Sequence, residues 1–175
     1  MIKKFLTTII VLALAGIAHA GEQLNADAVI QLIHKNGARS TIAEMWGKPS
    51  WGKTIQNIAS GSPQWLVVAA ELYLGSDTGS ASELRDAVAW ALPREPEQVL
   101  LMIADKSTSA TSRELFTIEV CSGPPVDFPG DDHESYYSHT LSAVQNIQNE
   151  KLLQLGSECL RKLNAAANYM KNKRQ

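Results

Sequence analysis

Residues 49–104 are divided by prolines and glycines into short segments, and this punctuation constrains the fold more than any other feature of the sequence. Pro63 and Pro96 each stand where a new segment begins, and proline is favoured at the first position of a helix because its missing N–H costs nothing there. Between the breaks, apolar residues recur at the three- and four-residue spacing of an α-helix. The pattern predicts a series of helices joined by short turns.

The same pattern occurs twice, with Pro63 and Pro96 33 residues apart. When the two prolines are aligned, seven apolar positions coincide in type, among them Trp51 with Leu84 and Leu66 with Val99. A period of this length is typical of paired antiparallel helices that stack on the next pair. Because only two copies are visible, the alternatives are a true repeat and two independent hairpins. We predict an all-α fold of stacked helical hairpins, either HEAT-like or an irregular bundle.

Polar residues that begin helices occur along the rest of the chain. Three of them form the S/T-x-x-E capping-box pattern, in which the third residue after the cap is a glutamate. These boxes begin at Thr41, Ser80 and Thr111, and single caps are predicted at Asn25, Ser50 and Asp132. Residues 115–121, LFTIEVC, alternate in polarity as a strand does, but no second strand is available to pair with them. We therefore predict that this segment is helical.

The first twenty residues have the three parts of a secretory signal peptide. Lys3 and Lys4 precede an uncharged run from Phe5 to Ala18, and small residues at 18 and 20 suit a signal peptidase. The run is shorter than the ~20 residues that span a bilayer. We expect cleavage after Ala20, a single all-α domain over residues 21–175, no membrane span in that domain, and a periplasmic or secreted location.

Cys121 and Cys159 are the two cysteines of the chain. An even number of cysteines in an exported protein indicates a disulfide. Neither cysteine lies at metal-ligand spacing from a histidine or from the other cysteine. We predict one structural disulfide between them.

Charge and motifs exclude several functions. Loss of the leader leaves 14 basic and 18 acidic residues, a net charge of −4, which does not suit nucleic acid binding. Residues 47–54, GKPSWGKT, match the phosphate-loop pattern, but that motif must follow a buried strand, and residues 41–46 carry a helix-capping box. We identify no set of catalytic residues, no metal site and no cofactor site. The sequence therefore favours a binding protein over an enzyme.

The proline-rich segment that follows Cys121 contains several carboxylates. They are Asp127, Asp131, Asp132 and Glu134. Their spacing does not fit a calcium loop, so solvation and helix capping are the plain interpretation. Because long ordered loops often carry function, we also consider them a possible interaction loop for a basic partner.

The sequence over residues 51–121 resembles small exported all-α proteobacterial proteins of uncharacterised function. The resemblance rests on IASGSPQWL, SDTGS and ALPREPEQVL, with a cysteine shortly after them. It implies export and a helical fold, and no activity.

These observations favour a monomeric periplasmic module that binds or inhibits another envelope or secreted protein, for example an immunity protein against an envelope-targeted toxin. The alternatives are a small-ligand carrier or an enzyme, with a pocket between helix hairpins near Trp51, Trp65 and Trp90, and a structural envelope protein.

Intact-mass spectrometry of protein isolated from its native host tests the export hypothesis. We expect a mass that lacks residues 1–20 and is two hydrogens below that of the fully reduced chain. An uncleaved N-terminus, or two thiols that react with iodoacetamide without prior reduction, would contradict it.

Overall fold

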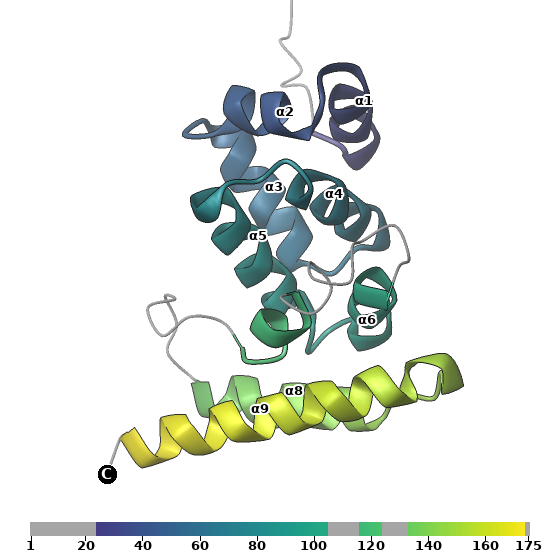
Figure 1. Cartoon of the computed structure of the whole chain (residues 1–175), viewed down its shortest axis with the longest axis vertical. Coiled ribbons are helices and arrows are strands. Elements are labelled where there is room, and N and C mark those ends of the chain that lie inside the picture. Colours follow the sequence, from purple (N-terminus) through teal and green to yellow (C-terminus); the bar gives the residue numbers. More distant parts are fainter. Residues whose placement is uncertain (1–23, 105–115, 124–132, 174–175) are drawn as a thin grey trace, which may run out of the picture.

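The computed structural model describes residues 24–104, 116–123 and 133–173. Over these ranges the chain is helical and contains no strand (Figure 1). The helices are α1 (Ala26–Asn36), α2 (Ala38–Met45), α3 (Pro49–Ala59), α4 (Pro63–Tyr73), α5 (Thr78–Ala91), α6 (Pro96–Ala104), α8 (His133–Gln145), the short 3₁₀ helix η1 (Glu150–Leu152) and α9 (Leu153–Lys173). Residues 116–120 are helical as well. The predicted all-α fold of stacked hairpins is confirmed.

The centre of the molecule consists of two stacked helix hairpins, α3–α4 and α5–α6. Helix α3 packs along α5, and α4 packs along both α5 and α6. Positions that the 33-residue period pairs in sequence are buried in both hairpins, such as Ile58 with Ala91 and Leu66 with Val99. The apolar spacing of the sequence therefore corresponds to the core of the stack.

Helices α1 and α2 cover one end of this stack (Figure 1). Asn25 begins α1 as predicted, since its side chain accepts a hydrogen bond from the backbone N–H of Ala28 at 2.7 Å. Gly37, with φ of 82°, ends α1 and lets the chain enter α2 at once, because glycine adopts positive φ without strain. Both helices pack on α4.

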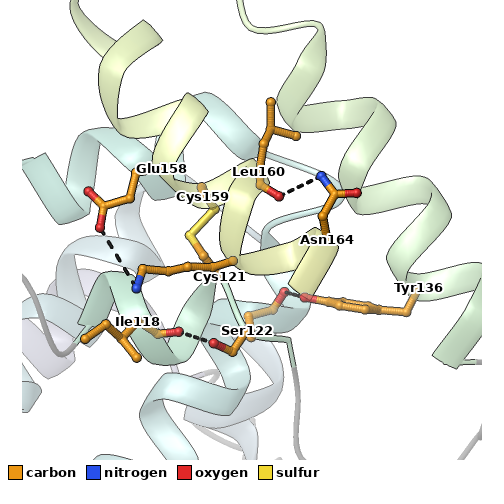
Figure 2. Close-up of a disulfide and its surroundings, with 10 residues drawn as sticks. Ile118, Cys121, Ser122, Tyr136, Glu158, Cys159, Leu160 and Asn164 are labelled. Atoms are coloured by element: carbon orange, nitrogen blue, oxygen red, sulfur yellow. Dashed lines mark hydrogen bonds and ion pairs between the residues drawn. A yellow bond between two sulfur atoms is a disulfide. The ribbon is translucent and has the colours of Figure 1, made fainter. Parts of the chain in front are cut away.

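Helices α8 and α9 form an antiparallel pair at the opposite end of the molecule (Figure 1). The predicted disulfide joins Cys121, just after residues 116–120, to Cys159 of α9, with 5.0 Å between their Cα atoms (Figure 2). Both cysteines are fully buried. Close to this bond, the hydroxyl of Tyr137 in α8 donates to the carbonyl of Ser122 at 2.8 Å. The C-terminal pair is thus tied covalently and by a hydrogen bond to the segment before it.

Three of the predicted helix starts are wrong by a few residues. Helix α2 begins at Ala38, so Thr41 lies inside it and donates its hydroxyl hydrogen to Gly37 O. Helix α3 begins at Pro49 with Lys48 as its N-cap, so Ser50 is already helical. In each case a glycine or proline nearby allowed the helix to begin earlier than the serine or threonine that was expected to cap it.

The third error concerns the start of α5. The capping box is formed by Asp77 and Ser80, because the Asp77 carboxylate accepts from Ser80 N–H at 3.0 Å and the Ser80 hydroxyl accepts from Asp77 N–H at 3.0 Å. Glu83, which was expected to close the box with Ser80, is therefore available for another role. The predicted caps Thr111 and Asp132 lie outside the described residues. The helical interpretation of LFTIEVC is confirmed for residues 116–120.

The turn after α4 lies against the start of α2, and this contact generates a prediction. A Cβ atom on Gly75 would collide with the backbone of Ala38 and Arg39, whereas one on Gly52, in α3, would meet no atom within 4 Å. We expect Gly75→Ala to lower the free energy of unfolding by about 2 kcal/mol through overpacking. Gly52→Ala, the control, should raise it by about 0.5–1 kcal/mol, because alanine favours the helix. Urea denaturation followed by circular dichroism measures both, and equal effects would contradict the packing of α4 on α2.

Candidate functional site

An open groove of about 640 Å³ runs between α3 and α5. Its apolar lining comes from one face of each helix, with polar side chains at its margins. The lining residues are Ile55, Gln56, Ala59, Ser60, Glu83, Asp86, Ala87, Trp90 and Arg94. A hollow of this size between helices is where ligands and partner segments are commonly held.

Trp90 has the largest side chain among the residues that line the groove, and Tyr136 of α8 packs against it. Its ring packs edge-to-face against the ring of Tyr136, with 5.2 Å between centroids. The Tyr136 hydroxyl donates to the carbonyl of Ala89 at 2.9 Å, so the tyrosine is itself fixed to α5. Because the indole is held from behind, the groove has a preformed aromatic wall.

Two carboxylates, Glu83 and Asp86, lie three residues apart on the groove face of α5. Residues at this spacing are neighbours on a helix surface. Glu83 Oε2 accepts a hydrogen bond from Trp51 Nε1 at 2.6 Å, which joins α5 to α3. Trp51 is buried and its ring lies 5.1 Å from that of Trp46, centroid to centroid. The orientation of Glu83 is therefore set by the core beneath the groove.

Burial is the main cause that raises the pKa of Asp86 from 3.8 to about 6, and the negative charge of Glu83 acts in the same direction. Arg85 acts in the opposite direction, but its guanidinium forms an ion pair with Glu119. Among the described residues no hydrogen bond stabilises the ionised form of Asp86. Within that part of the chain, its half-buried carboxylate lies beside apolar side chains and is bonded to no cation, and the charge of Arg85 offsets only part of the cost of burial.

Arg94 closes the groove at the far end of α5. Its Nη1 donates to the carbonyls of Ala59 and Trp90, each at 3.0 Å. These carbonyls belong to the last turns of α3 and α5, where backbone acceptors lack helical partners. One end of the groove therefore carries carboxylates and the other a guanidinium group.

The structure does not bring the three tryptophans of the predicted pocket together. Trp90 lines the groove between α3 and α5, and Trp51 is buried beneath it. Trp65 lies on a separate, more polar groove of about 880 Å³ beside the start of α1. A pocket between the hairpins exists, but only one of the three indoles forms its wall.

The predicted interaction loop is described only at its edge. Asp127, Asp131 and Asp132 lie outside the described residues, and Glu134 is exposed in the first turn of α8. The rejection of the phosphate loop agrees with the structure, because α2 precedes residues 47–54. The Thr54 hydroxyl, which would have bound Mg²⁺, is fully buried and donates to the carbonyl of Ser50 at 3.0 Å.

Sequence reasoning missed Asp86 and Arg94 altogether and took Glu83 for a helix cap. The only hint in the sequence was a stripe of residues spaced three or four apart. These residues are Glu83, Asp86, Trp90 and Arg94. Such a stripe is also typical of a solvated helix face, so it does not by itself indicate a groove.

Comparisons of the chain with protein-family models, with curated proteins and with solved structures found no match. Within the described ranges, no cluster of three or more histidine, cysteine, aspartate or glutamate side chains has the geometry of a metal site. None of the helices described is long and apolar enough to cross a bilayer.

The raised pKa of Asp86 leads to a prediction about how the stability of the fold depends on pH. Because folding raises this pKa, the ionised carboxylate destabilises the fold above about pH 6, and the cost falls as the pH drops towards 4. We expect Asp86→Asn to raise the free energy of unfolding by about 1 kcal/mol near neutral pH, after allowance for the water that still reaches the group. The gain should shrink when urea denaturation is repeated at about pH 4.5.

Glu158→Gln, at an exposed side chain of α9, is the control and should change stability by less than about 0.5 kcal/mol at either pH. A loss of stability in Asp86→Asn near neutral pH would show that the ionised carboxylate has a stabilising partner.

Proposed function

We propose that this protein is an exported binding module that holds a segment of another protein in the groove between α3 and α5. The observation that carries this proposal is a half-buried carboxylate, Asp86, beside the preformed indole wall of Trp90. A carboxylate in such surroundings lowers stability, and groups with strongly shifted pKa values cluster at functional sites. A partner that contacts Asp86 would offset the cost of its burial.

The disulfide supports an exported location. Cys121 and Cys159 are both fully buried and bonded, and structural disulfides persist in oxidising compartments such as the periplasm. We propose the periplasm or the exterior of the cell as the place of action, with residues 1–20 acting as a cleaved signal peptide.

An inhibitory role, such as immunity against an envelope-targeted toxin, is the most specific form of this proposal. It draws on the acidic residues predicted to bind a basic partner. The segments on either side of residues 124–132 are held together, since Tyr137 of α8 bonds to Ser122.

A small-molecule carrier is the second candidate, and the size of the groove favours it. About 640 Å³ lies within the range of pockets that hold small ligands. The openness of the groove along α3 and α5 favours an extended protein segment over an enclosed molecule, so we place binding of a protein first.

Site-specific photo-crosslinking in the native host tests the proposal. A photoreactive amino acid is introduced at Gln56 or Ser60, which are exposed at the margin of the groove, and in separate strains at Gln154 or Ser157, which are exposed on α9. We expect a protein adduct of one defined mass from the two groove positions only. The matched glutamine and serine positions on α9 control for chance collisions.

The same adduct from all four positions, or none from the groove, would contradict docking in the groove. A co-purified small molecule in the native mass spectrum, with no adduct, would favour the carrier instead. The crosslinking is repeated in the double variant Asp131→Asn with Asp132→Asn. An unchanged adduct in that variant would show that these two carboxylates do not contribute to the interface.

A further inference from the structure

We propose that the groove is specific for a segment that presents one lysine or arginine next to apolar side chains, with the cationic group between Glu83 and Asp86 and the apolar part against Trp90. This inference rests on the proposed function and names the chemistry of the partner. It follows from how charge is distributed along the groove.

The charges of the groove are separated along α5. Glu83 and Asp86 lie towards the start of this helix, and Arg94 follows its end. The Arg94 guanidinium donates to the carbonyl of Trp90, and at 1.5 Å per residue the rise along the helix axis from residue 83 to residue 90 is about 10 Å. The side chains that α3 and its C-cap contribute are all uncharged: Ile55, Gln56, Ala59 and Ser60. The groove therefore attracts a cation at one end and repels it at the other.

Within the described ranges, no ion pair is formed by Glu83 or Asp86, although the positive charge of Arg85 lowers the pKa of Asp86. Arg85 is the nearest positive group on α5, and it forms an ion pair with Glu119. Glu83 uses Oε2 for the Trp51 indole, which leaves Oε1 for a ligand. A lysine or arginine of a partner would stabilise the ionised form of Asp86 and would gain from its low-dielectric surroundings.

The rest of the groove suits the apolar neighbours of such a cation. Ile55, Ala59 and Ala87 form the floor, and Trp90 is one helical turn after Asp86. The aliphatic stem of a lysine or arginine packs well on an indole, and the charge is attracted to the face of the ring. A free inorganic cation would leave this apolar surface uncovered, so an amphipathic protein segment fits the whole groove better.

Titration of short peptides into the isotope-labelled protein tests the inference. The protein is expressed with its own leader and purified from the periplasm. Three synthetic peptides with blocked ends share the same leucine and serine residues and differ at one central position, which is lysine, glutamine or glutamate. The four indole N–H resonances serve as reporters, because Trp90 lines the groove, Trp51 bonds to Glu83, and Trp65 lies in the other groove.

We expect the lysine peptide to shift the Trp90 and Trp51 resonances and to bind about tenfold more tightly than the glutamate peptide. The preference should weaken as salt is added. It should disappear in the double variant Glu83→Gln with Asp86→Asn, in which the new amide oxygen at position 83 can still accept from Trp51. The control Glu158→Gln should keep it.

The failure of this inference is distinct from that of the proposed function. If all three peptides shift Trp90 equally, and the double variant binds as the native protein does, the groove docks apolar segments and the cation preference is refuted. If about 1 mM of every peptide leaves Trp90 unchanged, or shifts Trp65 alone, docking in this groove is refuted with it.

Discussion

The packing of α3 along α5 is the contact on which the core and the groove both depend. Helix α5 contributes small buried side chains, Ala87 and Ala91, which allow a neighbouring helix to approach closely. The larger residues Ile58 of α3 and Leu84 of α5 are fully buried in the same core. The two helices meet along their buried faces, and side chains beside this contact line the groove.

The C-terminal helices extend this arrangement to the aromatic wall. The disulfide ties α9 to the segment that ends at Cys121, and α8 packs on α9. Tyr136 of α8 then holds Trp90 from behind. A covalent bond remote from the groove thus helps to keep its indole in position. This coupling explains why a helix pair that does not line the groove still belongs to its architecture.

Asp86 is the residue at which stability and the proposed binding oppose each other in this fold. An apolar or neutral side chain at this position would avoid the cost of a half-buried carboxylate. A cost of this kind is typical of the trade-off between stability and function at functional sites. Glu83 differs from Asp86 in this respect, because its hydrogen bond to Trp51 connects two helices and so contributes to the fold as well.

The sequence alone determined the helical class, the hairpin stack and the disulfide. The signals that predicted them are local: helical spacing, proline at helix starts and glycine at the end of α1. Such signals can be recognised without knowledge of the tertiary structure. The starts of α2 and α3 were misjudged because α2 begins directly after a glycine and α3 begins at a proline, both without a side-chain cap. The start of α5 was misjudged because Asp77 rather than Glu83 completed the box with Ser80. Only the tertiary structure decided that Glu83, Asp86, Trp90 and Arg94 line one groove. That arrangement depends on how α3 and α8 lie against α5, and a pattern read along a single helix contains no information about its neighbours.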